Sequence, residues 1–90
     1  MARIVDPAII TAILYKRDRT CLYGLYVGDP CNGGLEVHHI EKRSQIGDDV
    51  PENLITLCHK HHQMAEQRLI DPDKFREILR YFGADQWQEK

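Results

Sequence analysis

The chain reads Leu35-Glu36-Val37-His38-His39-Ile40 and, after a polar stretch, Pro51-Glu52-Asn53-Leu54-Ile55-Thr56-Leu57-Cys58-His59-Lys60-His61-His62. These two segments contain all 5 histidines of the 90-residue sequence. Imidazole is the commonest metal-ligating side chain and a good general base near neutral pH. Such a concentration of histidine predicts one metal-assisted catalytic site.

The two segments have the character of two short strands followed by a helix. Residues 35–40 alternate apolar and polar side chains, which is typical of a half-buried strand. Residues 54–57 are expected to form a second strand. Residues 59–69 contain neither glycine nor proline and are expected to form a helix. The polar residues 41–50 are expected to form the loop between the strands.

Helix start signals lie outside this core on both sides. Asp6-Pro7 and Asp71-Pro72 each place an N-cap aspartate before a proline at the first helical position. They predict an N-terminal helix over residues 7–18 and a C-terminal helix over residues 72–82. Gly83 is well placed to end the second of these helices.

The size and charge of the chain limit what it can do. Ninety residues make a single domain over residues 1–90, with a core of about residues 21–70 that a bound metal would help to stabilise. A net charge of -2 excludes attachment to nucleic acid through bulk positive charge. Local attraction would need a patch such as residues 16–19 or 42–43, although short charge runs are usually solvated surface.

The cysteines and the absence of targeting signals indicate the compartment. The sequence shows no signal peptide and no transmembrane run, which predicts a cytoplasmic protein without a membrane partner. Its 3 cysteines cannot all pair within the chain, so metal binding is favoured over a disulfide framework. Residues 21–34, which hold two of these cysteines and much of the glycine, are expected to form a loop or knuckle without regular structure.

The strand with His38-His39, the asparagine before the second strand and the histidines after it resemble the HNH endonuclease family, particularly its small phage and prophage members. The resemblance covers about residues 21–66. It implies an α+β fold, with a small ββα-metal (His-Me finger) core and flanking N- and C-terminal helices. It also implies a metal-dependent DNA endonuclease, a hydrolase acting on phosphodiester bonds by a one-metal mechanism. By the same resemblance the protein would act in phage DNA packaging or processing, beside terminase and portal proteins in a bacterial host cell.

The resemblance assigns roles residue by residue. His39 matches the general base that activates the attacking water, and His38 and His62 match ligands of the catalytic ion. Asn53 matches the residue that ties loop and strand together and orients the base. The strand geometry agrees with this division, because adjacent residues point to opposite faces. One histidine can bind metal while the other keeps a lone pair for the proton.

Glu66 departs from the family pattern. It follows His62 by four residues, on the same helix face, where many members carry a further histidine ligand. As a ligand it would favour a hard ion such as Mg²⁺ or Mn²⁺, among the candidates Mg²⁺, Mn²⁺, Ni²⁺ and Zn²⁺. As a surface residue it would only pair with lysine or arginine.

A second, structural metal site is expected from the cysteines. Cys58-x-x-His61 has the spacing of half a zinc knuckle. Many family members complete such a site with Cys-x-x-Cys pairs, whereas here Cys21 is followed three residues later by Gly24, and Cys31 is the substitute. The hypothesis is a Zn²⁺ site of Cys21, Cys31, Cys58 and His61. In the competing interpretation zinc is lost, Cys58 is a core thiol, and the other two cysteines are free or paired.

Two further alternatives concern the substrate and the function. Arg43 lies close after the His-His strand and could contact a substrate phosphate, or it could be an exposed loop arginine. The rival function is a non-catalytic zinc-binding module that docks nucleic acid or protein, which would need the cysteines and His61 but not His39. A third interpretation is a nuclease that acts on RNA or branched DNA.

Overall fold

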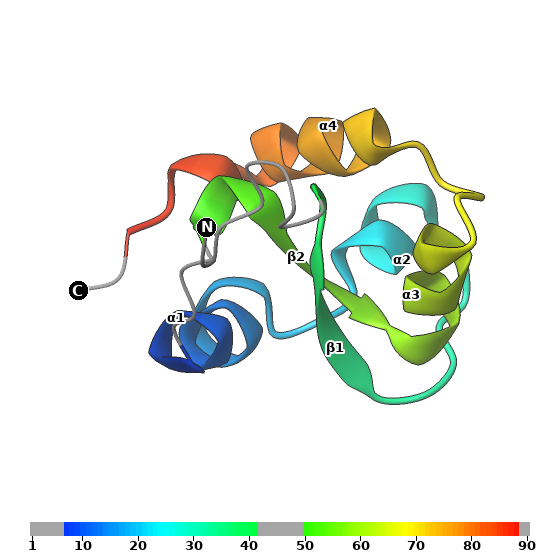
Figure 1. Cartoon of the computed structure of the whole chain (residues 1–90), viewed down its shortest axis with the longest axis horizontal. Helices are drawn as coiled ribbons and strands as arrows, with labels where there is room; N and C mark the ends of the chain where they lie inside the picture. The colour runs from blue at the N-terminus through cyan, green and yellow to red at the C-terminus, as the bar shows by residue number, and fades with distance from the viewer. Residues whose placement is uncertain (1–6, 42–49, 89–90) are drawn as a thin grey trace, which may run out of the picture.

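The computed structural model describes residues 7–41 and 50–88, which form an α+β fold and so confirm the predicted class (Figure 1). The elements in chain order are α1 Pro7–Ala12, the π-helix η1 Ile13–Asp18, α2 Leu22–Val27, β1 Leu35–His39, the 3-10 turn η2 Pro51–Asn53, β2 Leu54–Cys58, α3 His59–Glu66, α4 Pro72–Phe82 and the 3-10 turn η3 Ala84–Gln86. Within these residues, a two-stranded sheet runs directly into α3, and helices flank this ββα unit on both sides of the sequence.

The hairpin of β1 and β2 places the neighbouring His38 and His39 on opposite faces of the sheet. β1 and β2 pair antiparallel, with His38 opposite Ile55 and His39 opposite Leu54. Successive side chains of a strand point to opposite faces. Accordingly His38 is buried among core side chains, whereas His39 is half-buried.

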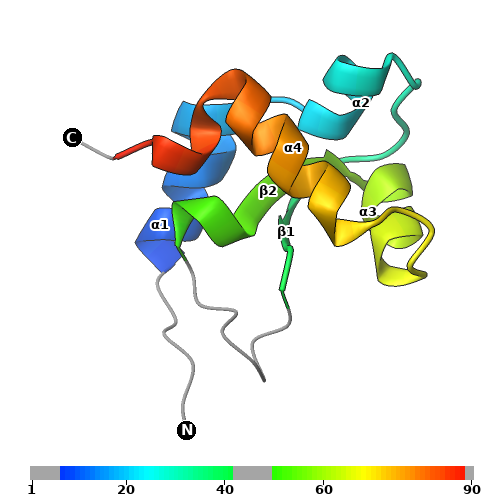
Figure 2. The same cartoon turned by 90° about the horizontal axis from the view of Figure 1, so that it is seen from above.

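α4 covers the hairpin with an apolar stripe. Its residues Phe75, Ile78 and Leu79 are buried and join the core of the ββα unit. Figure 2 shows the helix crossing above both strands. The Asp71 side chain caps the first turn, and Gly83, at φ +70°, ends the helix in the left-handed conformation that glycine adopts most easily. Both boundaries match the residues for which the sequence predicts a helix.

The segment 21–34 contains a helix, so the prediction of a loop without regular structure was wrong. Cys21 acts as the N-cap of α2, because its sulfur accepts the backbone N–H of Gly24 at 3.4 Å. Gly28, at φ +78°, ends the helix. Thiol caps are not among the usual helix start signals, which is why the sequence pattern did not indicate α2.

Two other helices differ from their predicted form. The predicted helix 7–18 is regular only as far as Ala12 and continues as the π-helix η1. α3 ends at Glu66 instead of continuing to residue 69. The chain turns there, since Arg68 adopts φ +61° and the N–H of Leu69 reaches back to the carbonyl of Met64 at 2.9 Å.

A buried ion pair at the end of η1 joins the N-terminal helices to the hairpin. The Asp18 carboxylate accepts two hydrogen bonds from the Arg17 guanidinium, at 2.6 and 3.0 Å. It also accepts a hydrogen bond from the backbone N–H of Thr56 at 2.9 Å. The Arg17 guanidinium donates to the carbonyl of Pro51 at 2.6 Å and to that of Leu54. The Arg17 side chain is 2% exposed. Both interpretations of residues 16–19, a candidate DNA-attracting patch or solvated surface, are therefore wrong for Arg17.

No helix among the described residues combines the length and apolar character needed to cross a bilayer.

Replacing Asp18 with asparagine is expected to destabilise the fold by about 3–5 kcal/mol, because it leaves the buried Arg17 charge uncompensated. The double variant Arg17→Met, Asp18→Asn should lose less than the single variant, since the unpaired charge is then removed. Urea unfolding of the three proteins at fixed metal concentration would measure both effects. A single variant within about 0.5 kcal/mol of the parent would contradict this account.

Candidate metal centres

Helix α3 presents two consecutive histidines to different surroundings. The His61 side chain is fully buried, whereas the His62 side chain is 25% exposed. Neighbouring residues in a helix with 3.6 residues per turn point about 100° apart. Each ring consequently meets a separate group of side chains.

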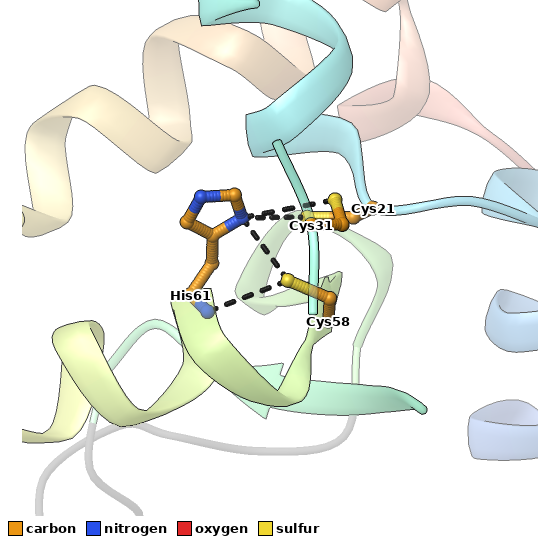
Figure 3. Close-up of side chains that lie close together, drawn as sticks. All are labelled: Cys21, Cys31, Cys58 and His61. Atoms are coloured by element: carbon orange, nitrogen blue, oxygen red, sulfur yellow. Dashed lines mark hydrogen bonds between the residues drawn. The ribbon is translucent and has the colours of Figure 1, made fainter. Parts of the chain in front are cut away.

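His61 meets three thiols. Its Nδ1 lies 3.2 Å from the sulfur of Cys21, 3.9 Å from that of Cys31 and 3.2 Å from that of Cys58. Figure 3 shows the three sulfurs gathered on the Nδ1 side of the ring. These four ligand atoms all lie within 4.8 Å of one another. All three cysteines lie in the described part of the chain, and all three are free thiols.

The two buried thiols are positioned by helix starts. Cys21 precedes α2 and Cys58 precedes α3, and each sulfur accepts the backbone N–H of the residue three positions later. These N–H groups belong to Gly24 and His61, at 3.4 and 3.5 Å. The same local turn is therefore used twice, and it points both sulfurs at one centre.

The third thiol takes space that a side chain at position 24 would need. A Cβ atom on Gly24 would lie 2.7 Å from the sulfur of Cys31, well inside van der Waals contact. Cys31 comes from the loop after α2 and is the exposed member of the group. Gly24 stands where the second cysteine of a Cys-x-x-Cys pair would be, and its lack of a side chain leaves room for the sulfur of Cys31.

The thiols differ in acidity. Burial raises the pKa of Cys58, but hydrogen bonds from the backbone N–H groups of His61 and Asn32 outweigh it and bring this pKa to about 7. Desolvation of its thiol, with hydrogen bonds to the other two thiols, raises the pKa of Cys31 to about 12. In the absence of a cation the group cannot hold three thiolates, whereas a divalent ion would favour them.

The second cluster consists of His38, His62 and Glu66. One carboxylate oxygen of Glu66 lies 3.4 Å from Nδ1 of His38 and 3.5 Å from Nε2 of His62. One ligand atom from each residue lies within 4.8 Å of the others. His38 and Glu66 also line a cleft of about 640 Å³ that runs between β1 and the turn from α3 to α4. Two of the three cluster residues thus border this cleft.

The donor atoms of both clusters fit metal ions. Three thiols and one imidazole are a usual tetrahedral ligand set for structural Zn²⁺. Two imidazoles and a carboxylate suit a divalent ion that keeps open positions for water or substrate. For Glu66, the contacts to His38 and His62 favour the ligand interpretation over a pair with lysine or arginine.

The remaining predicted residues take other positions. His39 is not among the ligand atoms of either cluster. Asn53 is buried, and its side chain accepts the N–H of Glu41 at 2.8 Å and donates to the carbonyl of Glu41 at 3.4 Å. It thereby joins the end of β1 to the start of β2. Arg43 lies outside the described residues.

Two carboxylates beside the histidines were missed by the sequence reasoning. Asp29 accepts a hydrogen bond from Nε2 of His61 at 2.6 Å, and Glu36 pairs with Nδ1 of His62. Hydrogen bonds from His61 and Lys60 lower the pKa of Asp29, and hydrogen bonds from His62 and His59 lower the pKa of Glu36. Glu36 stands two residues before His38, a spacing that shares a strand face, and that signal was available in the sequence.

Comparison with known proteins gives one family match. The model of the HNH endonuclease family matches residues 28–68. Comparison with curated proteins and with solved structures found no match. The matched range contains β1, β2, α3 and the whole second cluster, together with every thiol-cluster residue except Cys21. The resemblance seen in the sequence is therefore confirmed for residues 28–68, which match the HNH endonuclease family.

Proposed function

We propose that the protein is a metal-dependent endonuclease that hydrolyses DNA phosphodiester bonds at the cluster of His38, His62 and Glu66. The observation that carries the proposal is the convergence of these three side chains from β1 and α3 beside an open cleft. Residues from the two separate histidine segments meet there, in the part of the chain that matches a nuclease family. Nucleic acid is the substrate class of that family.

His39 would act as the general base. It follows a cluster residue on β1 but points to the other strand face and contributes no cluster atom, so it would take the water proton without being a ligand of the ion. A water oxygen would attack phosphorus, His39 would take the water proton, and the 3′ oxygen would leave to give a 5′ phosphate. A divalent ion at the cluster would supply Lewis-acid stabilisation of the charge that develops on oxygen. Asn53 would hold the backbone that carries the base.

The thiol cluster would have a structural role. Cys21, Cys31, Cys58 and His61 come from the start of α2, the following loop and the β2–α3 junction. A Zn²⁺ ion there would connect segments that are distant in sequence, and its binding energy would contribute directly to folding. Such support matters most where the hydrophobic core is small.

The substrate contacts and the cellular setting are proposed on the family resemblance. Arg43 would contact a substrate phosphate, and a net charge of -2 leaves such local contacts and the ion to attract DNA. Packaging or processing of phage DNA, beside terminase and portal proteins in the bacterial cytoplasm, is the proposed setting. The second candidate, a non-catalytic zinc-binding module, accounts for the thiol cluster but leaves the convergence at Glu66 without a role.

Cys31→Ala is expected to separate the effect of zinc from that of packing, because Cys31 is the exposed member of the thiol cluster. In the presence of zinc, the thermal midpoint of the variant should lie roughly 10 °C or more below that of the parent. For a domain of this size, each loss of about 1 kcal/mol in the free energy of unfolding lowers the midpoint by roughly 4–8 °C. In excess chelator the two proteins should unfold together. Thermal scans with both additions measure this, and equal midpoints in zinc would overturn the structural site.

The double variant Gly24→Cys, Cys31→Ala provides a matched rescue. It removes the sulfur that a Cβ at position 24 would strike and supplies a thiol three residues after Cys21. The carbonyl oxygen of Asp29 would still lie 3.0 Å from that Cβ, so the loop must shift slightly, and the variant should recover part of the zinc binding that Cys31→Ala loses. Gly24→Ala alone should lose zinc, because its new methyl group displaces the sulfur of Cys31.

His39→Ala is expected to lower plasmid cleavage by about 10²–10⁴-fold, the usual contribution of a general base. The protein should keep its zinc content and thermal midpoint, because His39 is half-buried and outside both clusters. Initial rates would be measured with Mg²⁺, Mn²⁺, Ni²⁺ and Zn²⁺ against a chelator blank, with Gln63→Ala as an exposed control on α3. Cleavage by the variant at the parent rate would exclude His39 as the base, and imidazole added to the variant should restore part of the rate.

Glu66→His is expected to keep cleavage but shift the preferred ion from Mg²⁺ or Mn²⁺ towards Ni²⁺ or Zn²⁺, because an imidazole replaces a hard oxygen ligand. Glu66→Ala should weaken activity with every ion. Metal titrations of the cleavage rate for the three proteins distinguish these outcomes. An unchanged metal preference in both variants would remove Glu66 from the ligand set.

A further inference from the structure

The two consecutive histidines of α3 use opposite ring nitrogens. His61 turns Nδ1 to the three thiols and gives Nε2 to the carboxylate of Asp29, at 2.6 Å. His62 turns Nε2 towards Glu66 and gives Nδ1 to the carboxylate of Glu36. Each ring therefore lies between a cluster on one side and a carboxylate on the other.

This arrangement decides where each ring can offer a lone pair. A neutral imidazole has one N–H and one lone pair, and an ionised carboxylate can only accept a hydrogen bond. His62 faces a carboxylate on both sides, but Glu36 makes the closer contact with Nδ1, whereas the oxygen of Glu66 lies 3.5 Å from Nε2. The nitrogen that is hydrogen-bonded to Asp29 or Glu36 therefore carries the hydrogen, and the opposite nitrogen of each ring carries the lone pair. A carboxylate that accepts the outer N–H of a ligand histidine is a recurrent way to fix its tautomer and orientation.

The carboxylates are themselves held by neighbouring residues of α3. Asp29 also pairs with Nζ of Lys60 at 3.0 Å, and that amine donates to the carbonyl of Pro30 at 3.0 Å. The second oxygen of Glu36 pairs with Nδ1 of His59 at 3.0 Å. Each carboxylate thus contacts α3 at two places.

We propose that Asp29 and Glu36 are positioning residues that assign the adjacent His61 and His62 to two different divalent ions, through Nδ1 and Nε2 respectively. The proposal rests on the two metal centres of the proposed function. It adds that each centre has its own carboxylate, so each can be weakened separately. Neither carboxylate ligates an ion in this scheme.

The first test measures the affinity of each centre by chelator competition, with Co²⁺ as the probe because thiolate ligation gives it a distinct absorption. Each affinity is measured with the other centre saturated. Under this condition Asp29→Ala should weaken the thiol centre by about 10–100-fold and leave the second centre unchanged. Glu36→Ala should weaken the second centre by a similar factor and leave the thiol centre unchanged. Each variant serves as the control for a general loss of structure in the other variant. Equal losses of affinity at both centres in either variant would overturn the assignment.

A second test uses the variant His61→Cys, which lacks the ring that Asp29 is proposed to orient. In His61→Cys the first centre has four thiols and no imidazole. Asp29→Ala should then cost no affinity there. A loss as large as in the parent would show that Asp29 acts on the fold and would overturn its positioning role. Asp29→Asn, which keeps an acceptor oxygen without the charge, should fall between the parent and Asp29→Ala.

A third test determines the metal-bound nitrogen directly. Two-bond ¹H–¹⁵N correlation spectra of the zinc-loaded protein distinguish rings bound through Nδ1 from rings bound through Nε2. The expected result is Nδ1 for His61 and Nε2 for His62, and the same nitrogen in both rings would overturn the proposal. None of these measurements involves cleavage. A protein that gives the expected pattern but cuts no DNA would refute the proposed nuclease and leave this assignment intact.

Discussion

The arrangement of the molecule depends on the contact between three thiols and Nδ1 of His61. Cys21 and Cys58 reach that point from two helix starts, and Cys31 reaches it from the loop between α2 and β1. This convergence fixes the first turn of α3 against the end of β2. Because His62 is the next residue of the same turn, its direction follows from that of His61. The second cluster therefore inherits its geometry from the first.

The hairpin and α4 could be predicted because their signals are local. Alternation over residues 35–40 and the Asp71-Pro72 start describe single elements, and the structure reproduces both. The two groups of candidate ligands could be predicted because ligand chemistry restricts which residue types can share an ion. In contrast, Asp29 has no periodic relation to His61, and only the folded loop brings them together.

The predictions for Arg17 and for the segment that forms α2 were wrong for a common physical reason. The sequence around Arg17 resembles a solvated charge run, yet carbonyls from Pro51 and Leu54 and the carboxylate of Asp18 compensate the guanidinium inside the protein. α2 begins at a sulfur cap, for which sequence patterns give no helix signal. In both cases a distant or unusual partner satisfies a polar group, and local propensity contains no information about that partner.

If both proposed centres bind ions, the adjacency of His61 and His62 would link the two binding equilibria. If occupancy of the thiol centre by an ion orders the first turn of α3, it raises the affinity of the neighbouring centre by some factor. Reciprocity then requires that occupancy of the neighbouring centre raise the affinity of the thiol centre by the same factor. A change in zinc supply would in this way alter the response to a second, chemically different cation. One helical turn would suffice to couple the availability of two metals.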